Sequence, residues 1–252
     1  MKTIFISGTA GAGKSLLTSK IHEYYTKNGV FCSILNLDPG VESLPYTPDV
    51  DVRDYVDIIS VMKQYDLGPN GALIMANDLI ASKIDDIRAD VDRVNPDYLL
   101  VDTPGQIELF AYRTSGPFVI ENISSDEKVS LFLFDGTLIT SPVNFVSVSL
   151  LATAIKLRTK LPSINVLTKT DIITTKLKEI LEWSTNLRTL ENAIAKESDG
   201  ETYALTSTIL RALNLGGFAQ GLIPLSNVTG QGMVNLEGAL SRVINLGEEV
   251  ED

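Results

Sequence analysis

The chain has 252 residues, of which 44% are hydrophobic and 21% charged, a composition typical of a folded globular protein with a sizeable core. Asp and Glu outnumber Lys and Arg by 32 to 21, so the formal net charge of -11 disfavours nucleic acid as a general partner. A single cysteine excludes an intramolecular disulfide, and no apolar run approaches the roughly eighteen residues of a membrane-spanning helix. We therefore expect a soluble, cytoplasmic protein with no membrane partner.

Apolar, β-rich runs recur along the chain, and helical patterns separate most of them. The runs lie at 3–7, 31–37, 98–102, 129–134, 163–167 and 222–225. Strands that alternate with helices and are apolar nearly throughout predict an α/β fold, with a mainly parallel sheet and helices on both faces. Ligands of such sheets bind beyond the carboxyl ends of the strands, and the motifs described below follow those ends.

A glycine-rich loop follows the first run. Residues 8–15 read GTAGAGKS, a complete Gly-x-x-x-x-Gly-Lys-Ser phosphate-binding loop, and a helical pattern opens directly after it. Glycines let backbone N–H groups turn toward phosphate oxygens, and the helix presents its positive end to the same anion. Lys14 reaches the terminal phosphates, and the Ser15 hydroxyl ligates Mg²⁺. The residues predicted to bind the nucleotide here are Gly11, Ala12, Gly13, Lys14, Ser15 and Leu16.

The context of this loop predicts a P-loop nucleoside triphosphatase fold. A glycine-rich turn without a ligand is the alternative, which the complete match between a strand and a helix disfavours. The loop alone does not choose between ATP and GTP.

Helical patterns fill the longer connections. Between 71 and 94, apolar residues repeat every three or four positions, as one face of an amphipathic helix requires. Patterns at 176–196 and 203–214 predict a helical insertion at about 174–216, before the last strand. No repeat or proline-rich linker marks a boundary, so we expect one domain over residues 1–252.

The strand at 98–101 ends in Asp102-Thr103-Pro104-Gly105-Gln106, the arrangement of a GTPase third motif. Asp102 can hold Mg²⁺ through a water, the Gly105 N–H is suited to contact the γ-phosphate, and Gln106 can orient a water. An Asp-x-Pro-Gly turn after a strand is common by itself. Its pairing with the phosphate loop favours the catalytic interpretation.

A guanine-type motif follows the strand at 163–167, where Thr168-Lys169-Thr170-Asp171 is close to Asn-Lys-x-Asp. Guanine offers two adjacent donors that one carboxylate, Asp171, can accept, whereas adenine presents an acceptor there. Lys169 can lay its stem on the base, and the Thr168 hydroxyl replaces the usual amide. The alternative is a helix cap by Asp171. After the last strand, Asn227 and Val228 stand where a backbone N–H reads guanine O6, although a simple loop explains them equally well.

The tripeptide Gly68-Pro69-Asn70 immediately precedes the helical pattern at 71–94 and, with the three motifs above, makes the chain resemble the GPN-loop GTPases over almost its whole length. A Gly-Pro-Asn turn by itself is only a turn. Further matching segments are NLDPG at 36–40, YTPDVDVRD at 46–54 and QIE at 106–108. The family's GPN-loop segment corresponds to about 64–95.

This resemblance implies a homodimeric, Mg²⁺-dependent GTPase whose nucleotide sites face the dimer interface. Asn70, with Gly68 and Pro69, would approach the γ-phosphate bound by the other subunit and help to hold the attacking water. Gln106, with Asp38 as a helper, would orient that water for in-line attack. Because eukaryotic members are associated with the assembly of RNA polymerase II, the resemblance also implies a nucleotide-controlled switch or assembly factor.

Other functions share parts of the pattern. A small-molecule P-loop kinase would use residues 8–15 to pass the phosphate to a bound acceptor, typically under an arginine-bearing lid that the sequence does not reveal. A GTP-dependent binding module would use the nucleotide as a timer with little turnover. A metal-delivery GTPase is disfavoured, because one histidine and one cysteine cannot supply a transition-metal cluster.

Overall fold

The computed structural model describes residues 1–113, 115–216 and 221–245, and within them the chain forms one sheet of seven strands. Their spatial order is β3-β2-β4-β1-β5-β6-β7, and every neighbouring pair runs parallel. The strands are β1 (Lys2–Gly8), β2 (Cys32–Asn36), β3 (Val50–Asp51), β4 (Tyr98–Asp102), β5 (Glu127–Asp135), β6 (Ser163–Thr168) and β7 (Leu222–Pro224). The predicted parallel sheet is confirmed, and the two-residue edge strand β3 is an addition to it.

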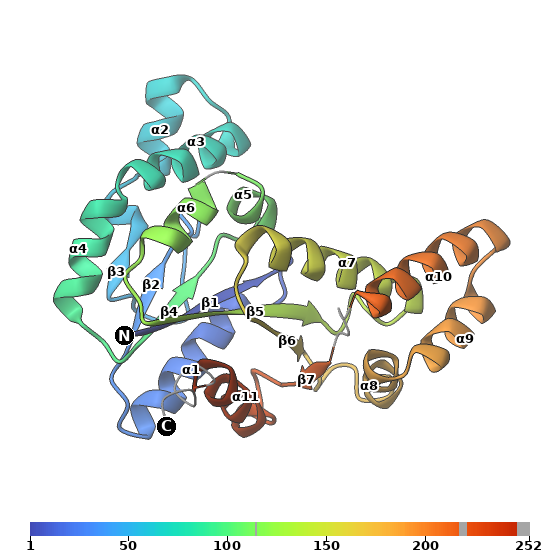
Figure 1. Cartoon of the computed structure of the whole chain (residues 1–252). Helices are drawn as coiled ribbons and strands as arrows, with labels where there is room; N and C mark the ends of the chain where they lie inside the picture. Colours follow the sequence, from blue (N-terminus) through green and yellow to red (C-terminus); the bar gives the residue numbers. More distant parts are fainter. Residues whose placement is uncertain (114, 217–220, 246–252) are drawn as a thin grey trace.

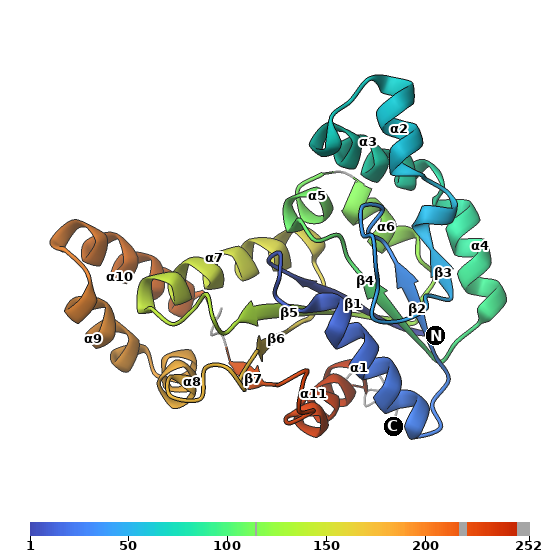
Figure 2. The same ribbon diagram turned by 180° about the vertical axis from the view of Figure 1, so that it is seen from behind.

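Helices cover both faces of this sheet, as predicted. They are α1 (Lys14–Lys27), α2 (Ile58–Tyr65), α3 (Pro69–Ser82), α4 (Ile84–Val94), α5 (Ile107–Ala111), α6 (Ser115–Asn122), α7 (Pro142–Thr159), α8 (Leu177–Thr185), α9 (Leu187–Glu197), α10 (Gly200–Leu215) and α11 (Met233–Asn245). Helices α1 and α11 lie on one face and α4, α6 and α7 on the other (Figures 1 and 2), while α9 and α10 extend past the edge at β7. Within the described ranges, none of these helices is both long and apolar enough to cross a membrane.

Alternating side chains along the strands build separate layers of core on the two faces. In β1, Ile4 and Ile6 pack with α1 and α11, whereas Phe5 packs with α3, α4 and α6. In β5, Phe132 and Phe134 face a third cluster formed with α7 to α10. Each of these side chains is at most 1% exposed, and burying one contributes roughly 1.5–3 kcal/mol. The layers hold the carboxyl ends of β1, β4 and β6 at one edge, where the predicted motifs begin.

The pattern at 71–94 forms two helices rather than the single helix that we expected. Helix α3 ends at Ser82 and α4 begins at Ile84, because Lys83 leaves the helical conformation with φ -102° and ψ 7°. Two aspartates in the first turn of α4 favour a new helix start through the helix dipole. Ile80 and Ile84, on either side of the break, belong to the same buried cluster, so the bend keeps the apolar stripe against the sheet.

The pattern at 176–196 is also divided, into α8 and α9. Asn186 stands between them with extended backbone, and its side-chain oxygen accepts from Arg188 N at 3.1 Å and Thr189 N at 3.3 Å. An asparagine in this position satisfies two N–H groups that a helix start leaves open. The local cap therefore overrides the apolar periodicity that predicted one continuous helix.

Candidate nucleotide site

The phosphate loop connects the buried strand β1 to helix α1. Gly13 directly precedes the helix with φ 91°, a left-handed conformation that glycine adopts without strain. A side chain at Gly8 would meet atoms of Leu133 at 2.9 Å, because β1 and β5 are paired there. The glycines thus allow a tight loop whose helix start, at the carboxyl edge of the sheet, favours an anion.

The Lys14 ammonium lies between this loop and the third motif and is only 6% exposed. Its Nζ donates to the carbonyl oxygens of Gly8, Thr9 and Gly105, each at 3.2 Å. The contact with Gly105 joins segments far apart in sequence, since β1 and β4 are neighbours in the sheet. This position suits a cation that neutralises terminal phosphate oxygens.

Asp102 ends β4 and is 1% exposed. Its Oδ2 accepts from Tyr46 Oη at 2.7 Å, whereas its Oδ1 is buried without a hydrogen-bond partner in the described part of the chain. Burial raises the pKa of Asp102, while the Ser15 and Tyr46 side chains and the charge of Lys14 oppose the increase. A buried carboxylate oxygen without a donor, close to a serine hydroxyl, fits the hard oxygen ligands that Mg²⁺ takes.

Asp38 follows β2 and contacts the third motif directly. Gly105 N donates to Asp38 Oδ2 at 3.0 Å, and Gly40 N donates to Asp38 Oδ1 at 2.9 Å. Asn36 steadies the turn, because its side-chain oxygen accepts from Asp38 N at 3.0 Å. The Gly105 N–H was predicted to contact the γ-phosphate, and the Asp38 carboxylate was predicted to help position water. In the structure the first group donates a hydrogen bond to the second.

Thr168 ties the guanine-type motif to the phosphate loop. Its fully buried hydroxyl lies 2.9 Å from the carbonyl oxygen of Ala12 and 3.2 Å from that of Phe134. A threonine hydroxyl thus links the two loops at the position where the common motif has an asparagine. The two binding elements are held together by a contact between residues 156 positions apart.

Lys169 is held by a carboxylate at the end of β5. Its Nζ lies 2.6 Å from Asp135 Oδ2, and its own backbone has φ 60°, which is uncommon for a residue with a side chain. Burial would raise the pKa of Asp135, but hydrogen bonds from Lys169 and Thr137 and the Lys169 charge outweigh it and lower that pKa. The ion pair and the left-handed backbone fix the direction in which the lysine stem leaves the loop.

Asp171 is oriented by the loop after β7. Ser226 Oγ donates to Asp171 Oδ1 at 2.6 Å, which leaves Oδ2 with no partner in the described part of the chain. Asn227 is buried, and its Nδ2 donates to Gly13 O at 3.2 Å, so the second loop is also tied to the phosphate loop. Val228 is 76% exposed, and its side chain contributes nothing to this network.

Tyr46, Asp135 and Ser226 belong to the site geometry, although the motifs did not single them out as functional. The signal for Asp135 was available, since it is the first charged residue after a long apolar run that ends in FLF. Ser226 stands beside Asn227 at the end of another run, and Tyr46 belongs to the matched segment at 46–54. Their hydrogen-bond partners lie 34 to 56 positions away along the chain, so a short sequence motif cannot identify these contacts.

The GPN turn forms the start of helix α3. Gly68 caps the start of α3 and Pro69 is its first residue, a position where proline's missing N–H is harmless. Gly68, Pro69 and Asn70 are all exposed, as is Gln106. Figure 1 shows α2 and α3 as a pair of helices that projects from the sheet, and Leu73, one turn into α3, lies beside Gly40 in the turn that holds Asp38.

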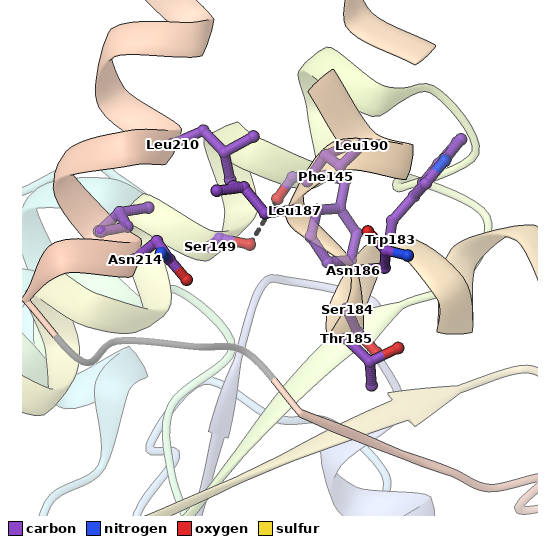
Figure 3. A pocket seen from close by; sticks show the side chains of 11 residues that line it. Phe145, Ser149, Trp183, Ser184, Thr185, Asn186, Leu187, Leu190, Leu210 and Asn214 are labelled. Atoms are coloured by element: carbon purple, nitrogen blue, oxygen red, sulfur yellow. Dashed lines mark hydrogen bonds between the residues drawn. The ribbon is translucent and has the colours of Figure 1, made fainter. Parts of the chain in front are cut away.

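A pocket in the helical region 174–216 is separate from the site. It has a volume of about 60 Å³ and lies between α7 and α8 to α10, with Phe145, Trp183 and Leu210 among its lining residues (Figure 3). Its lining residues come from the helices α7 to α10 and their connections, not from the loops that follow β1, β4 and β6. Ser149 already donates to Phe145 O at 2.8 Å, so the pocket reads as a gap in helix packing rather than a nucleotide site.

Known proteins resemble the chain over most of its length. A family model described as a conserved hypothetical ATP binding protein matches residues 6–245. GPN-loop GTPase 1 of Dictyostelium discoideum is 34% identical over 235 residues, covering 91% of this chain and 58% of the relative. GPN-loop GTPase 1 of Schizosaccharomyces pombe is 31% identical, covering 98% of this chain and 70% of the relative. The chain thus spans about three fifths of the length of the first of these relatives.

A solved structure agrees with this assignment. A GTPase from Pyrococcus abyssi, crystallised in its apo form, superposes with a TM-score of 0.84 at 27% identity, covering 96% of this chain and 97% of the other. The description of the family model names ATP, whereas the relatives are named GTPases; the Lys169 and Asp171 arrangement agrees with the latter. From these matches and the predicted motifs in order along the fold, the chain belongs to the GPN-loop GTPase family.

Proposed function

We propose that the chain hydrolyses GTP to GDP and phosphate at this site. The observation that carries the proposal is the pair of ties between the guanine-type loops and the phosphate loop, made by Thr168 to Ala12 and by Asn227 to Gly13. They place Asp171 in a fixed relation to the phosphate-binding glycines, as recognition of one nucleotide at both ends requires. Asp171 can accept from guanine N1–H and the exocyclic amine but finds an acceptor in adenine, which favours GTP over ATP.

The residues of the phosphate end have complementary tasks. Backbone N–H groups of residues 11–16 bind the phosphates, and Lys14 neutralises β- and γ-phosphate oxygens. Ser15 and Asp102 would hold Mg²⁺, which supplies further neutralisation of the phosphate charge when bound. Little covalent chemistry is needed from the protein, so positioning and charge carry the rate.

The contact between Asp38 and Gly105 suggests how the water is positioned. A γ-phosphate that accepts from Gly105 N–H takes the place of Asp38 Oδ2, which now accepts that hydrogen bond at 3.0 Å. The released carboxylate can then accept from the attacking water, together with the exposed Gln106 side chain. The same exchange would couple the presence of the third phosphate to the position of the loop after β2.

We propose further that the chain acts as a homodimer in which Asn70 completes the site of the other subunit. Its exposure at the start of α3 supports this arrangement. An amide can donate to phosphoryl oxygens and accept from water, partly replacing an arginine finger. A single domain over residues 1–252, with an insertion at 174–216, and a role as a switch or assembly factor for a client such as RNA polymerase complete the proposal.

Phosphate release from GTP and from ATP tests this function. Wild-type protein should release phosphate faster from GTP, and Asn70→Ala should slow release about a hundredfold, the typical effect of losing one transition-state donor. The matched control is Asn192→Ala, which removes another exposed asparagine, on α9. GDP affinity should be unchanged in both variants, and turnover per chain should increase with protein concentration if the dimer completes the site. Equal turnover of wild type and Asn70→Ala would contradict the catalytic role of the turn.

A further inference from the structure

The motif YTP at 46–48 belongs to the loop between β2 and β3, and the mechanism above gives it no task. Tyr46 is the residue of this motif that reaches the site, because its hydroxyl donates to Asp102 Oδ2 at 2.7 Å. We propose that Tyr46 is a positioning residue for the Mg²⁺ site, and that it acts by fixing the orientation of the Asp102 carboxylate. This inference rests on the proposed nucleotide site.

The two oxygens of Asp102 have different surroundings, which is the first argument. Oδ2 has the Tyr46 hydroxyl as its donor, while Oδ1 is buried and has no hydrogen-bond partner in the described part of the chain. A carboxylate held at one oxygen keeps the other in a defined direction. Without the tyrosine donor, the Ser15 side chain is the remaining partner of the carboxylate, which can then adopt a wider range of angles about the Cβ–Cγ bond, so a cation or its water meets a less ordered ligand.

The second argument is that Tyr46 is itself held in place. Ser19 Oγ, on α1, donates to the carbonyl oxygen of Pro45 at 3.1 Å, so the residue before Tyr46 is anchored to the helix that starts with the phosphate-binding lysine. The Tyr46 ring packs against the core cluster shared by β1, α1 and α11. An anchored ring presents its hydroxyl without loss of side-chain freedom at the moment of binding.

The third argument concerns charge. Asp102 is 1% exposed, and a buried polar group costs free energy unless hydrogen-bond donors satisfy it. The Tyr46 hydroxyl supplies one without adding a positive charge that would compete with the cation. Outer partners of this type typically change metal affinity by about 10- to 100-fold when they are removed.

GDP affinity, measured by titration calorimetry at increasing Mg²⁺ concentrations and in EDTA, tests the inference. Tyr46→Phe keeps the packed ring and removes only the donor. We expect it to need about tenfold more Mg²⁺ for half of the Mg²⁺-dependent gain in GDP affinity, with unchanged affinity in EDTA. Tyr55→Phe is the matched control, since it removes a tyrosine-to-carboxylate hydrogen bond to Asp90, on α4, and should titrate like wild type.

Two further variants make the test independent of the stability of Tyr46→Phe. Ser19→Ala loosens the loop without touching the tyrosine hydroxyl and should shift the Mg²⁺ midpoint in the same direction by a smaller factor. In an Asp102→Asn background, Tyr46→Phe should have no additional effect on the midpoint, because its target is already altered.

The outcomes separate this inference from the proposed function. If wild-type protein shows Mg²⁺-dependent GDP binding and Tyr46→Phe has the same midpoint with only a lower melting temperature, Tyr46 is a packing residue and the inference is wrong. If GDP binding by the wild type does not depend on Mg²⁺ at all, both the inference and the Mg²⁺ part of the proposed function fail. If the wild type binds no guanine nucleotide, the proposed function itself fails.

Discussion

The ion pair between Lys169 and Asp135 allows a quantitative test of how the guanine-type loop is held. Its atoms are 2.6 Å apart, and the side chains are 31% and 5% exposed. Hydrogen bonds to charged groups contribute about 1.5–3 kcal/mol, and the partial exposure of the lysine places this pair at the lower end. Asp135→Asn removes the charge but keeps an oxygen that can accept from Thr137 N and Oγ1, at 2.9 and 2.7 Å in the wild type.

A double-mutant cycle with Asp135→Asn and Lys169→Met isolates this contribution. We expect a coupling of about 1.5 kcal/mol in the free energy of unfolding, measured by urea denaturation without nucleotide at pH 7. Lys169→Met alone should be the more harmful single change, because it leaves a buried carboxylate without its cation. A coupling within about 0.3 kcal/mol of zero would refute the claim that the Lys169–Asp135 pair stabilises the folded chain.

The pH dependence of this coupling follows from the lowered pKa of Asp135. Its folded pKa lies below the ordinary value of 3.8, so the stabilisation is complete above the unfolded pKa and is lost as the pH falls through the folded pKa. Coupling should therefore stay constant from pH 7 to about pH 5 and decrease only below about pH 4. A coupling that weakens between pH 7 and pH 5 would mean that another group controls it.

Three other changes have expected outcomes. Thr168→Val, which leaves two buried carbonyls without their hydroxyl, should lower the free energy of unfolding by about 1–2 kcal/mol in urea denaturation; no change would show that the tie is not needed for stability. Ser226→Ala frees Asp171 and should reduce the preference for GTP over ATP about tenfold in competition binding, whereas an unchanged ratio would count against its orienting role. Gly232→Ala should destabilise by more than about 1 kcal/mol, because φ is 95° and the new methyl would lie 2.1 Å from a carbonyl oxygen. Gly238→Ala, inside α11 with open space around it, is the control and should stabilise slightly when both variants are compared with wild type by urea denaturation.

Much of the fold could be predicted because its information is local. Each major strand is an apolar run ended by polar or glycine residues, and the observed bounds differ from the predicted runs by at most a few residues. The exceptions have local causes that periodicity does not register. Lys83 interrupts the helix within the long amphipathic stripe, Asn186 starts a new helix, and β3 has only the residues 50–51, too few to form a recognisable run.

The candidate site divides in the same way. The phosphate loop, the third motif and the guanine-type motif could be predicted from the residues alone, since each is a contiguous segment whose chemistry depends on close spacing. The contacts of Tyr46 with Asp102, of Asp38 with Gly105 and of Asp135 with Lys169 could be found only in the folded chain. The reason is the strand order: because β4 lies between β2 and β1, and β5 lies beside β6, loops distant along the chain meet at one edge of the sheet.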